Sequence, residues 1–243
     1  MGRFILGFNK THLIEFWVQF QSRLRQIFLM LTLALTLIMI FSTFSRVQAA
    51  PSESQCSDEM QTASAALHLS YPARTNLGQP VKVIFTLKEG HLIADFEVQN
   101  SHINSKPNLG AGEYPYQHDV VELFVSVADP KTGHFPYFEF ELTPLDQTFN
   151  VQINDLKKPF INNVDKGAIH HSEMNASGWR GEIDIPLANL GWDGDISKVA
   201  GNAYSIFGVA PNRSYWSLSI PNQPRPNFHQ PQFFKPFFQC RHQ

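Results

Sequence analysis

The sequence predicts an all-β fold, an antiparallel β-sandwich that follows an N-terminal signal segment. Short stretches of alternating polar and apolar residues recur about every ten residues, as the strands of a sandwich do. Clusters of Pro, Gly and Asn separate these stretches, and no long segment keeps the 3.6-residue period of an amphipathic helix. These patterns favour two antiparallel sheets packed face to face.

Residues 1–49 have the features of a secretory signal peptide with an extended N-terminal region. Ile27 to Phe44 form an apolar run without charge, and Arg23 and Arg25 precede this run. Val47 and Ala49 are small residues at the two positions that a signal peptidase reads, so we expect cleavage after Ala49. The mature domain is then exported to the periplasm or the extracellular space.

An uncleaved membrane anchor is the alternative, because residues 27–44 approach the ~20 apolar residues that cross a bilayer. The domain would then stay tethered to the membrane through residues 27–44, and residues 50–57 would form a short stalk. We expect no other contact with a membrane.

Residues 50–243 suit a single domain, since single cores extend to ~200 residues. The leader holds five basic residues and one acidic residue, whereas the whole chain has a formal net charge of −2, so the domain itself is acidic. Nucleic acid is therefore excluded as a partner, because its phosphates require a basic surface.

The chain has two cysteines, Cys56 and Cys240, near the two ends of the expected domain. In an oxidising compartment an isolated pair tends to form one disulfide, and the first and last strands of a sandwich often run side by side. We therefore expect a Cys56–Cys240 disulfide, with two free thiols in the terminal tails as the alternative.

Two strand pairs are the clearest elements. Lys82–Leu87 and His91–Val98 both alternate and flank the turn residues Glu89 and Gly90, which predicts a β-hairpin. Val120–Val127 and Pro136–Leu142 predict a second pair around a turn-rich segment. Further strands are expected at Asn150–Ile153, Gly178–Ile185 and Ala203–Ala210, a helical turn at Leu187–Leu190, and long loops at Gln99–His118, Asn154–Ser177 and Pro211–Phe228.

Four segments, in order along the chain, resemble family 9 carbohydrate-binding modules and their DOMON-like relatives. They are Tyr116–Phe124 (YQHDVVELF), Tyr137–Leu142 (YFEFEL), Gly178–Pro186 (GWRGEIDIP), and Tyr215–Ser217 (YWS) followed by Pro226–Pro231 (PNFHQP). The resemblance implies a jelly-roll-like sandwich in which two aromatic rings clamp a terminal sugar. Tyr116 and Phe228 match the clamp positions, where the family usually has Trp, and Glu122 matches the family's strand glutamate. Glu141 stands where the family has a basic residue.

The chemistry of sugars also indicates these loops as the binding site. A sugar ring has an apolar C–H face and a rim of hydroxyls, so its site needs aromatic planes and polar groups. Tyr114, Tyr116, Trp216 and Phe228 lie in or beside the predicted loops, with His118, Asp119, Glu122, Asn212, Arg213 and His229 nearby. The sequence therefore predicts an oligo- or polysaccharide site in which Tyr116, Trp216 and Phe228 stack on sugar and Glu122, Asn212 and Arg213 contact hydroxyls. Trp179, on an alternating strand, is expected in the core.

Catalysis is not expected. Asp119 and Glu122 are three apart on an expected strand, so they point to opposite faces and cannot act together as acid and base. We expect Asp119 to brace its loop through backbone N–H groups instead. As no catalytic domain is evident, a separate hydrolase or transporter is the expected partner.

No cofactor is expected, but two alternatives stay open. Structural calcium has oxygen donors in loops at Asp129, Asp165, Glu173, Asp193 and Asp195. A DOMON-type electron-transfer or sensory domain would hold b-type haem through His170, His171 and Met174. A degenerate module with a structural or interaction role is a third interpretation.

Overall fold

The structure is a computed structural model that describes residues 60–72, 80–208, 211–221 and 223–239. The expected signal segment, its cleavage site and the cysteines Cys56 and Cys240 lie outside these residues, so the predictions made for them stay predictions. Within the described residues no helix is both long and apolar enough to cross a membrane.

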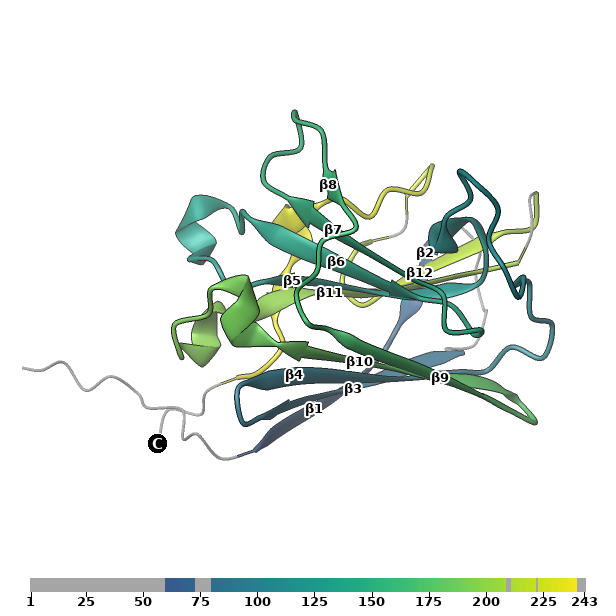
Figure 1. Cartoon of the computed structure of the whole chain (residues 1–243), viewed down its shortest axis with the longest axis horizontal. Helices are drawn as coiled ribbons and strands as arrows, with labels where there is room; N and C mark the ends of the chain where they lie inside the picture. Colours follow the sequence, from purple (N-terminus) through teal and green to yellow (C-terminus); the bar gives the residue numbers. More distant parts are fainter. Residues whose placement is uncertain (1–59, 73–79, 209–210, 222, 240–243) are drawn as a thin grey trace, which may run out of the picture. The chain divides into compact units, whose positions relative to one another are not determined.

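Two antiparallel sheets, A and B, lie one above the other (Figure 1). Sheet A has the order β1 (Gln61–Ala66), β3 (Val81–Lys88), β4 (His91–Val98), β10 (Gly178–Pro186) and β9 (Ile169–Asn175). Sheet B has the order β2 (His68–Tyr71), β12 (Ser214–Ser217), β11 (Ala200–Phe207), β5 (Val120–Ser126), β6 (Tyr137–Leu142), β7 (Thr148–Ile153) and β8 (Ile161–Asn162), and β13 (Lys235–Pro236) pairs with β11. The predicted β-sandwich is confirmed.

Short 3-10 helices interrupt the connections between strands, and the described residues form no α-helix. They are η1 (Pro115–Gln117), η2 (Pro130–Thr132), η3 (Leu187–Leu190), η4 (Ile196–Lys198) and η5 (Pro231–Phe233). The predicted helical turn at Leu187–Leu190 is η3.

The β3–β4 hairpin forms as its alternation predicts. Glu89 and Gly90 both have positive φ, 53° and 79°, which is the backbone of the tight turns that match the twist of a hairpin. Val83 and Phe85 are buried, whereas Ile84, between them, is 44% exposed. Sheet A thus has one face in the core and one face in solvent.

Sheet B differs because both faces of its central strands are buried. On β5 the odd-numbered residues Val121 and Leu123 join the core between the sheets. The even-numbered residues Val120 and Phe124 join a second apolar cluster on the opposite, outer face. Strands β6, β7 and β11 supply further members of this second cluster, and loops and the C-terminal segment add Ile220, Phe228 and Phe234. The outer face of sheet B is therefore roofed by loops.

The core between the sheets contains large side chains from both of them. Trp179 on β10 is 1% exposed, which confirms its predicted place in the core, and it lies in the same cluster as Phe96 and Phe140. Three apolar side chains on the inner face of β10 alternate with solvent-facing residues, as a half-buried strand requires.

Two of the predicted long loops contain strands that the sequence analysis missed. β8 and β9 lie in the segment assigned to the Asn154–Ser177 loop, and β12 lies in the Pro211–Phe228 segment, so both loop assignments were wrong in part. β9 is a polar edge strand in which most residues are exposed. It lacks the alternation that identifies a half-buried strand, and backbone pairing with β10 defines it instead.

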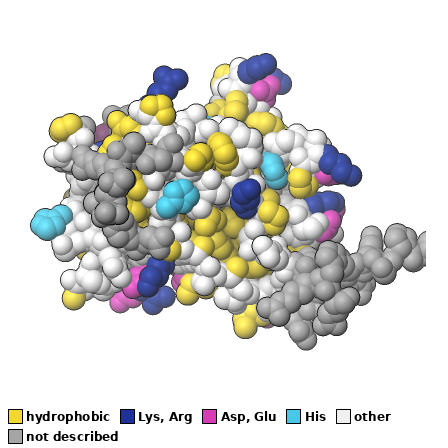
Figure 2. Space-filling model, turned by 180° about the vertical axis from the view of Figure 1, so that it is seen from behind, with side chains coloured by type: hydrophobic (Ala, Val, Ile, Leu, Met, Phe, Trp, Pro, Cys, Tyr) yellow, Lys and Arg dark blue, Asp and Glu magenta, His cyan; other side chains and the backbone are white. Residues whose placement is uncertain are grey.

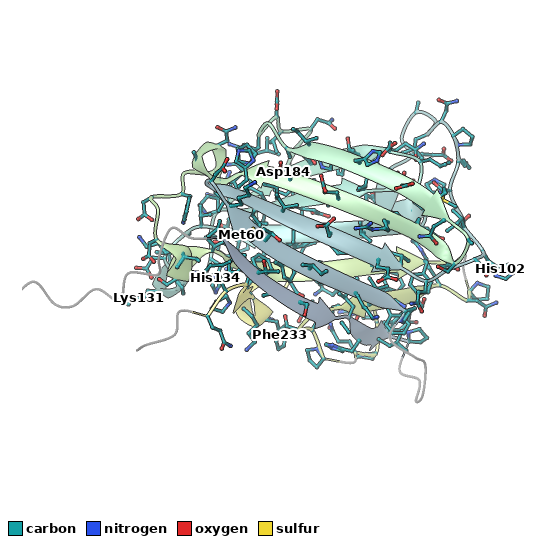
Figure 3. All side chains as sticks on the ribbon, turned by 90° about the horizontal axis from the view of Figure 1, so that it is seen from below. Met60, His102, Lys131, His134, Asp184 and Phe233 are labelled. Carbon is teal, nitrogen blue, oxygen red and sulfur yellow. The ribbon has the colours of Figure 1, made fainter. Side chains whose placement is uncertain are left out.

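The connections gather at the two ends of the strands. Seen from below in Figure 3, His102 lies at one end, whereas Lys131, His134 and Phe233 lie toward the other. In the space-filling view of Figure 2, hydrophobic side chains gather in the middle of the face, and most charged side chains lie toward its edges.

One pair of variants tests which face of sheet A is buried in the core and which is exposed to solvent. Ile183→Ala removes a fully buried side chain and should lower the free energy of unfolding by about 2–5 kcal/mol. Ile84→Ala, the same change at a site that is 44% exposed, should cost less than about 1 kcal/mol. Urea denaturation of both variants measures the difference, and equal losses would contradict the assignment of the two faces.

Candidate functional site

A cleft of about 710 Å³ opens on the outer face of sheet B, beneath the loops that roof it. It is bounded by sheet residues and by three loop segments around η1, β8 and residues 226–229. The lining residues are Tyr114, Tyr116, Glu122, Phe124, Glu139, Glu141, Phe149, Val151, Pro159, Phe160, Asn162, Ile206, Tyr215, Pro226, Asn227, Phe228 and His229.

A second hollow of similar volume lies on sheet A, lined by residues of β1, β3, β4 and β10. Its only aromatic lining residue among those described is Phe96, which is 1% exposed and belongs to the core. The cleft on sheet B is the better candidate, because its lining combines exposed aromatic rings with converging polar groups.

Three glutamates form the floor of the cleft. Glu122 on β5 is paired with Glu141 on β6, and Glu139 is two residues before Glu141, so strand alternation turns all three to the same face. Their carboxylate oxygens lie within 4.8 Å of one another, and the three residues are 2%, 6% and 0% exposed for Glu122, Glu139 and Glu141. Glu122 was predicted as a site residue from the sequence, whereas Glu139 and Glu141 were not.

Burial controls the protonation of this cluster. It raises the pKa of Glu122 and Glu141 well above the usual range, and the negative charges of the neighbouring glutamates add to the effect. Burial also raises the pKa of Glu139, to about 7. The cluster therefore holds protons near neutral pH.

Aromatic rings form the walls. Tyr114 and Tyr116 are stacked with ring centroids 5.3 Å apart, and Tyr116 is 40% exposed. Phe228 stacks on Tyr204 at 4.0 Å, and Tyr215 meets Phe228 edge-on at 5.9 Å. Protein rings support one side of Tyr116 and of Phe228, and Phe228 is only 9% exposed, so Tyr116 presents the more open ring to the cleft.

The peptide groups around Tyr116 are held from two sides. The Tyr116 N–H donates to the Glu141 carboxylate at 2.9 Å. Arg213 donates to the carbonyl oxygens of Tyr116 and of His118, the latter at 3.0 Å, and its guanidinium lies over the Tyr215 ring at 5.5 Å. Arg213 thus fixes the loop that carries Tyr116, and it is not among the residues that line the cleft.

Asp119 braces the same loop, as predicted. Its carboxylate accepts hydrogen bonds from the Asn100 side chain at 2.9 Å, the Asn104 N–H at 3.0 Å and the Gly208 N–H at 2.8 Å. Glu122 faces the cleft, whereas Asp119 is absent from its lining. Burial nevertheless raises the pKa of Asp119, and these hydrogen bonds oppose the rise.

Trp216 does not join the predicted aromatic set. Its side chain is 2% exposed, belongs to the core between the sheets and stacks on Phe207 at 5.7 Å. Neighbouring residues on a strand face opposite sides, so Tyr215 and not Trp216 lines the cleft. Asn212 is exposed in the turn before β12 and is also absent from the lining. The structure thus brings together Tyr116, Glu122 and Phe228, with Arg213 beside them.

His229 closes one side of the glutamate floor. Its Nδ1 lies 2.9 Å from the Tyr137 hydroxyl, and its Nε2 lies 3.8 Å from Glu139. Burial lowers the pKa of His229 to about 4, so the ring is neutral at physiological pH. The histidine therefore contributes a hydrogen-bonding group and no positive charge.

The residues considered for cofactors lie elsewhere. Asp193 and Asp195, the best local pair for calcium, both engage Lys198. His170, His171 and Met174 all lie on the edge strand β9 of sheet A, where His170 and its neighbour His171 face opposite sides. Among the described residues, the glutamate floor is the one group of three or more acidic, His or Cys side chains close enough to share a metal ion.

No protein-family model matches the sequence, and no curated protein matches it significantly. Among solved structures, the chain is similar to a proposed carbohydrate-binding protein from Bacteroides uniformis, with a TM-score of 0.56 and 16% identity over 72% of this chain and 84% of that one. This likeness shows a shared fold.

The chain is also similar to a family 9 carbohydrate-binding module from Caldicellulosiruptor kristjanssonii, solved with cellotriose and with glucose. Both structures give a TM-score of 0.44 and 13% identity. The matches cover 65% of this chain and 73% of that one for the cellotriose complex, and 70% and 82% for the glucose complex.

Loss of the Asp119 brace should destabilise the loop beneath the site. Asp119→Ala removes the acceptor of three hydrogen bonds and should lower the free energy of unfolding by about 3 kcal/mol. Asp119→Asn keeps one acceptor oxygen, so its free energy of unfolding should fall by less than that of Asp119→Ala. Chemical denaturation of both variants measures the effect, and a loss below about 0.5 kcal/mol for Asp119→Ala would contradict the bracing role.

The buried glutamates should make stability depend on pH. A folded-state pKa of about 7 for Glu139, above its usual 4.5, gives stability that is complete below pH 4.5 and is lost as the pH rises through 7. Glu139→Gln cannot ionise, so it should not lose this stability. The free energy of unfolding of the variant minus that of the wild type should therefore rise by about 2–3 kcal/mol between pH 5 and pH 8.5. Parallel pH profiles of the two proteins would show that Glu139 titrates normally.

Proposed function

We propose that this protein binds carbohydrate in the cleft on sheet B and does not catalyse a reaction there. The observation that carries the proposal is the combination, in one cleft, of preformed aromatic planes and a floor of converging carboxyl groups. The cleft volume of about 710 Å³ falls in the range of small-molecule sites, about 300–1,000 Å³.

Aromatic planes and carboxyl groups together suit a sugar better than a purely apolar ligand. The C–H face of a sugar ring packs on an aromatic plane; Tyr116 and Tyr215 offer such planes, and Phe228, which is 9% exposed, packs edge-on against Tyr215. Sugar hydroxyls both donate and accept hydrogen bonds, and carboxyl groups that exchange protons near neutral pH can match either role. Asn162 and Asn227 add neutral amides to the lining.

The similarity of fold to a proposed carbohydrate-binding protein supports this function without identifying a ligand. The predicted site residues Tyr116, Glu122 and Phe228 keep their roles in the proposal. Tyr215 replaces Trp216 as the third aromatic contact, and Arg213 acts by positioning Tyr116.

The arrangement of the three glutamates argues against glycoside hydrolysis, although it supplies carboxylates that the sequence analysis did not foresee. A glycosidase places its two carboxyl groups on either side of the scissile bond. Glu122, Glu139 and Glu141 all project from one face of two adjacent strands, so they approach a bound ring from one side. Binding without bond cleavage is the activity that this geometry favours.

Export remains part of the proposal. An exported binder meets polysaccharides outside the cytoplasm, and a separate hydrolase or transporter would use the captured sugar. The Cys56–Cys240 disulfide would support a domain that works in an oxidising compartment.

A glycan array with the full-length protein tests the function, and titration calorimetry with a responsive glycan tests the site. Tyr116→Ala and Tyr215→Ala should each weaken binding by about 10-fold or more, because each removes an aromatic plane. Trp216→Phe, in the core, is the matched control and should change affinity less than about 2-fold.

Two outcomes would contradict this proposal. Unchanged binding in both tyrosine variants would place the sugar outside the cleft. A protein that binds no glycan on the array would remove the function itself.

A further inference from the structure

We propose that the sugar recognised in this cleft carries a free, protonated amino group, which binds above Glu122, Glu139 and Glu141. The inference rests on the proposed function, because it names the class of saccharide that the same cleft would take.

The cleft has three glutamates in its lining, and no Lys or Arg among the described lining residues to balance them when they ionise. The adjacent cation, Arg213, opposes the rise in the pKa of Glu122, but it lies outside the lining and donates to the carbonyl oxygens of Tyr116 and His118. His229 is neutral at physiological pH. A ligand that brings its own positive charge would complete this site.

An ammonium group matches the three glutamates in number and in kind. It has three N–H donors and no acceptor, whereas three ionised carboxylates are acceptors only. Glu141 Oε1 is buried without a hydrogen-bond partner in a residue that is 0% exposed, and Glu141 lines the cleft. A carboxylate cluster this tight repels itself strongly when ionised, so a cation gains most by binding between its members.

The aromatic lining favours the same ligand. Phe124 lies on β5 beside Glu122, and Tyr116 and Tyr215 line the walls. The electron-rich faces of aromatic rings attract a cation, and the attraction grows when water is excluded. A neutral sugar would use the rings for stacking alone, whereas an amino sugar would use both the rings and the carboxylates.

A divalent metal ion fits the cleft less well. Calcium takes six to eight oxygen ligands at about 2.3–2.6 Å. Beyond the three glutamates, the described lining offers mainly aromatic and aliphatic side chains, and its volume is that of a sugar-sized ligand and not of a single ion. The metal is therefore an outcome for the experiment to distinguish.

The test uses three β-1,4-linked tetrasaccharides that differ at carbon 2: the glucosamine, the N-acetylglucosamine and the glucose tetramers. Binding to the full-length protein is measured by calorimetry at pH 6 in buffer containing EDTA. We expect the glucosamine tetramer to bind at least 10-fold more tightly than the other two. Its affinity should fall with added salt, since the contact is between charges.

Proton release supplies an independent readout. The titratable groups around Glu139 are Glu122, Glu141, His229, Tyr116, Tyr137 and Tyr204, and the charge of Arg213 acts on Glu122. An ammonium ion favours the ionised carboxylates, so binding at pH 6 should release protons, which titrations in two buffers of different ionisation enthalpy detect. Glu139→Gln should weaken binding of the glucosamine tetramer about 10-fold and binding of the glucose tetramer much less, so the preference for the amino sugar should fall. The control Glu173→Gln, on exposed β9, should change neither affinity.

Other results would contradict the amine inference, the proposed carbohydrate binding, or both. Equal affinity for the three tetramers, or a preference for the acetylated or neutral one, overturns the amine inference and leaves carbohydrate binding standing. Failure of all three tetramers, with no response on the glycan array, overturns both. Equal binding of 1,3-diaminopropane and the glucosamine tetramer would make the cleft an ammonium site and would refute sugar binding there. Binding that appears only when calcium replaces EDTA would assign the glutamates to a metal.

Discussion

Three carboxylates buried on one face of sheet B are the constraint on which the rest of the site depends. The pairing of β5 with β6 places Glu122 opposite Glu141, and alternation adds Glu139 to the same face. Burial makes their simultaneous ionisation costly, so the cluster has to be protonated or neutralised. The loops over the cleft help to bury these carboxyl groups, and the neutral His229 adds no positive charge to offset them.

The glutamates also connect the sheet to its loops. Glu141 accepts the Tyr116 N–H, Arg213 holds the Tyr116 carbonyl, and Asp119 ties the preceding loop to the start of β5. The aromatic walls are therefore positioned by polar contacts that begin on the sheet. Because sheet A covers only the inner face of sheet B, the loops can form a cleft without disturbing the main core.

Much of this architecture follows from local sequence patterns. The β3–β4 hairpin, η3 and the bracing role of Asp119 each depend on neighbouring residues, and the structure confirms all three. β9 was missed because its polar sequence carries no period, and only pairing with β10 makes it a strand. The choice between Tyr215 and Trp216 depends on which side of β12 faces the core, and two adjacent aromatic residues do not reveal it. The grouping of Glu139 with Glu122 likewise depends on the pairing of strands.

Hydrogen–deuterium exchange of the full-length protein, with and without its tightest-binding saccharide, tests the central claim most directly. The account predicts slower exchange in the segments that line the cleft, residues 114–124, 159–162 and 226–229, with β3 and β4 of sheet A unchanged. Protection confined to sheet A, with none in the segments around the three glutamates, would contradict it.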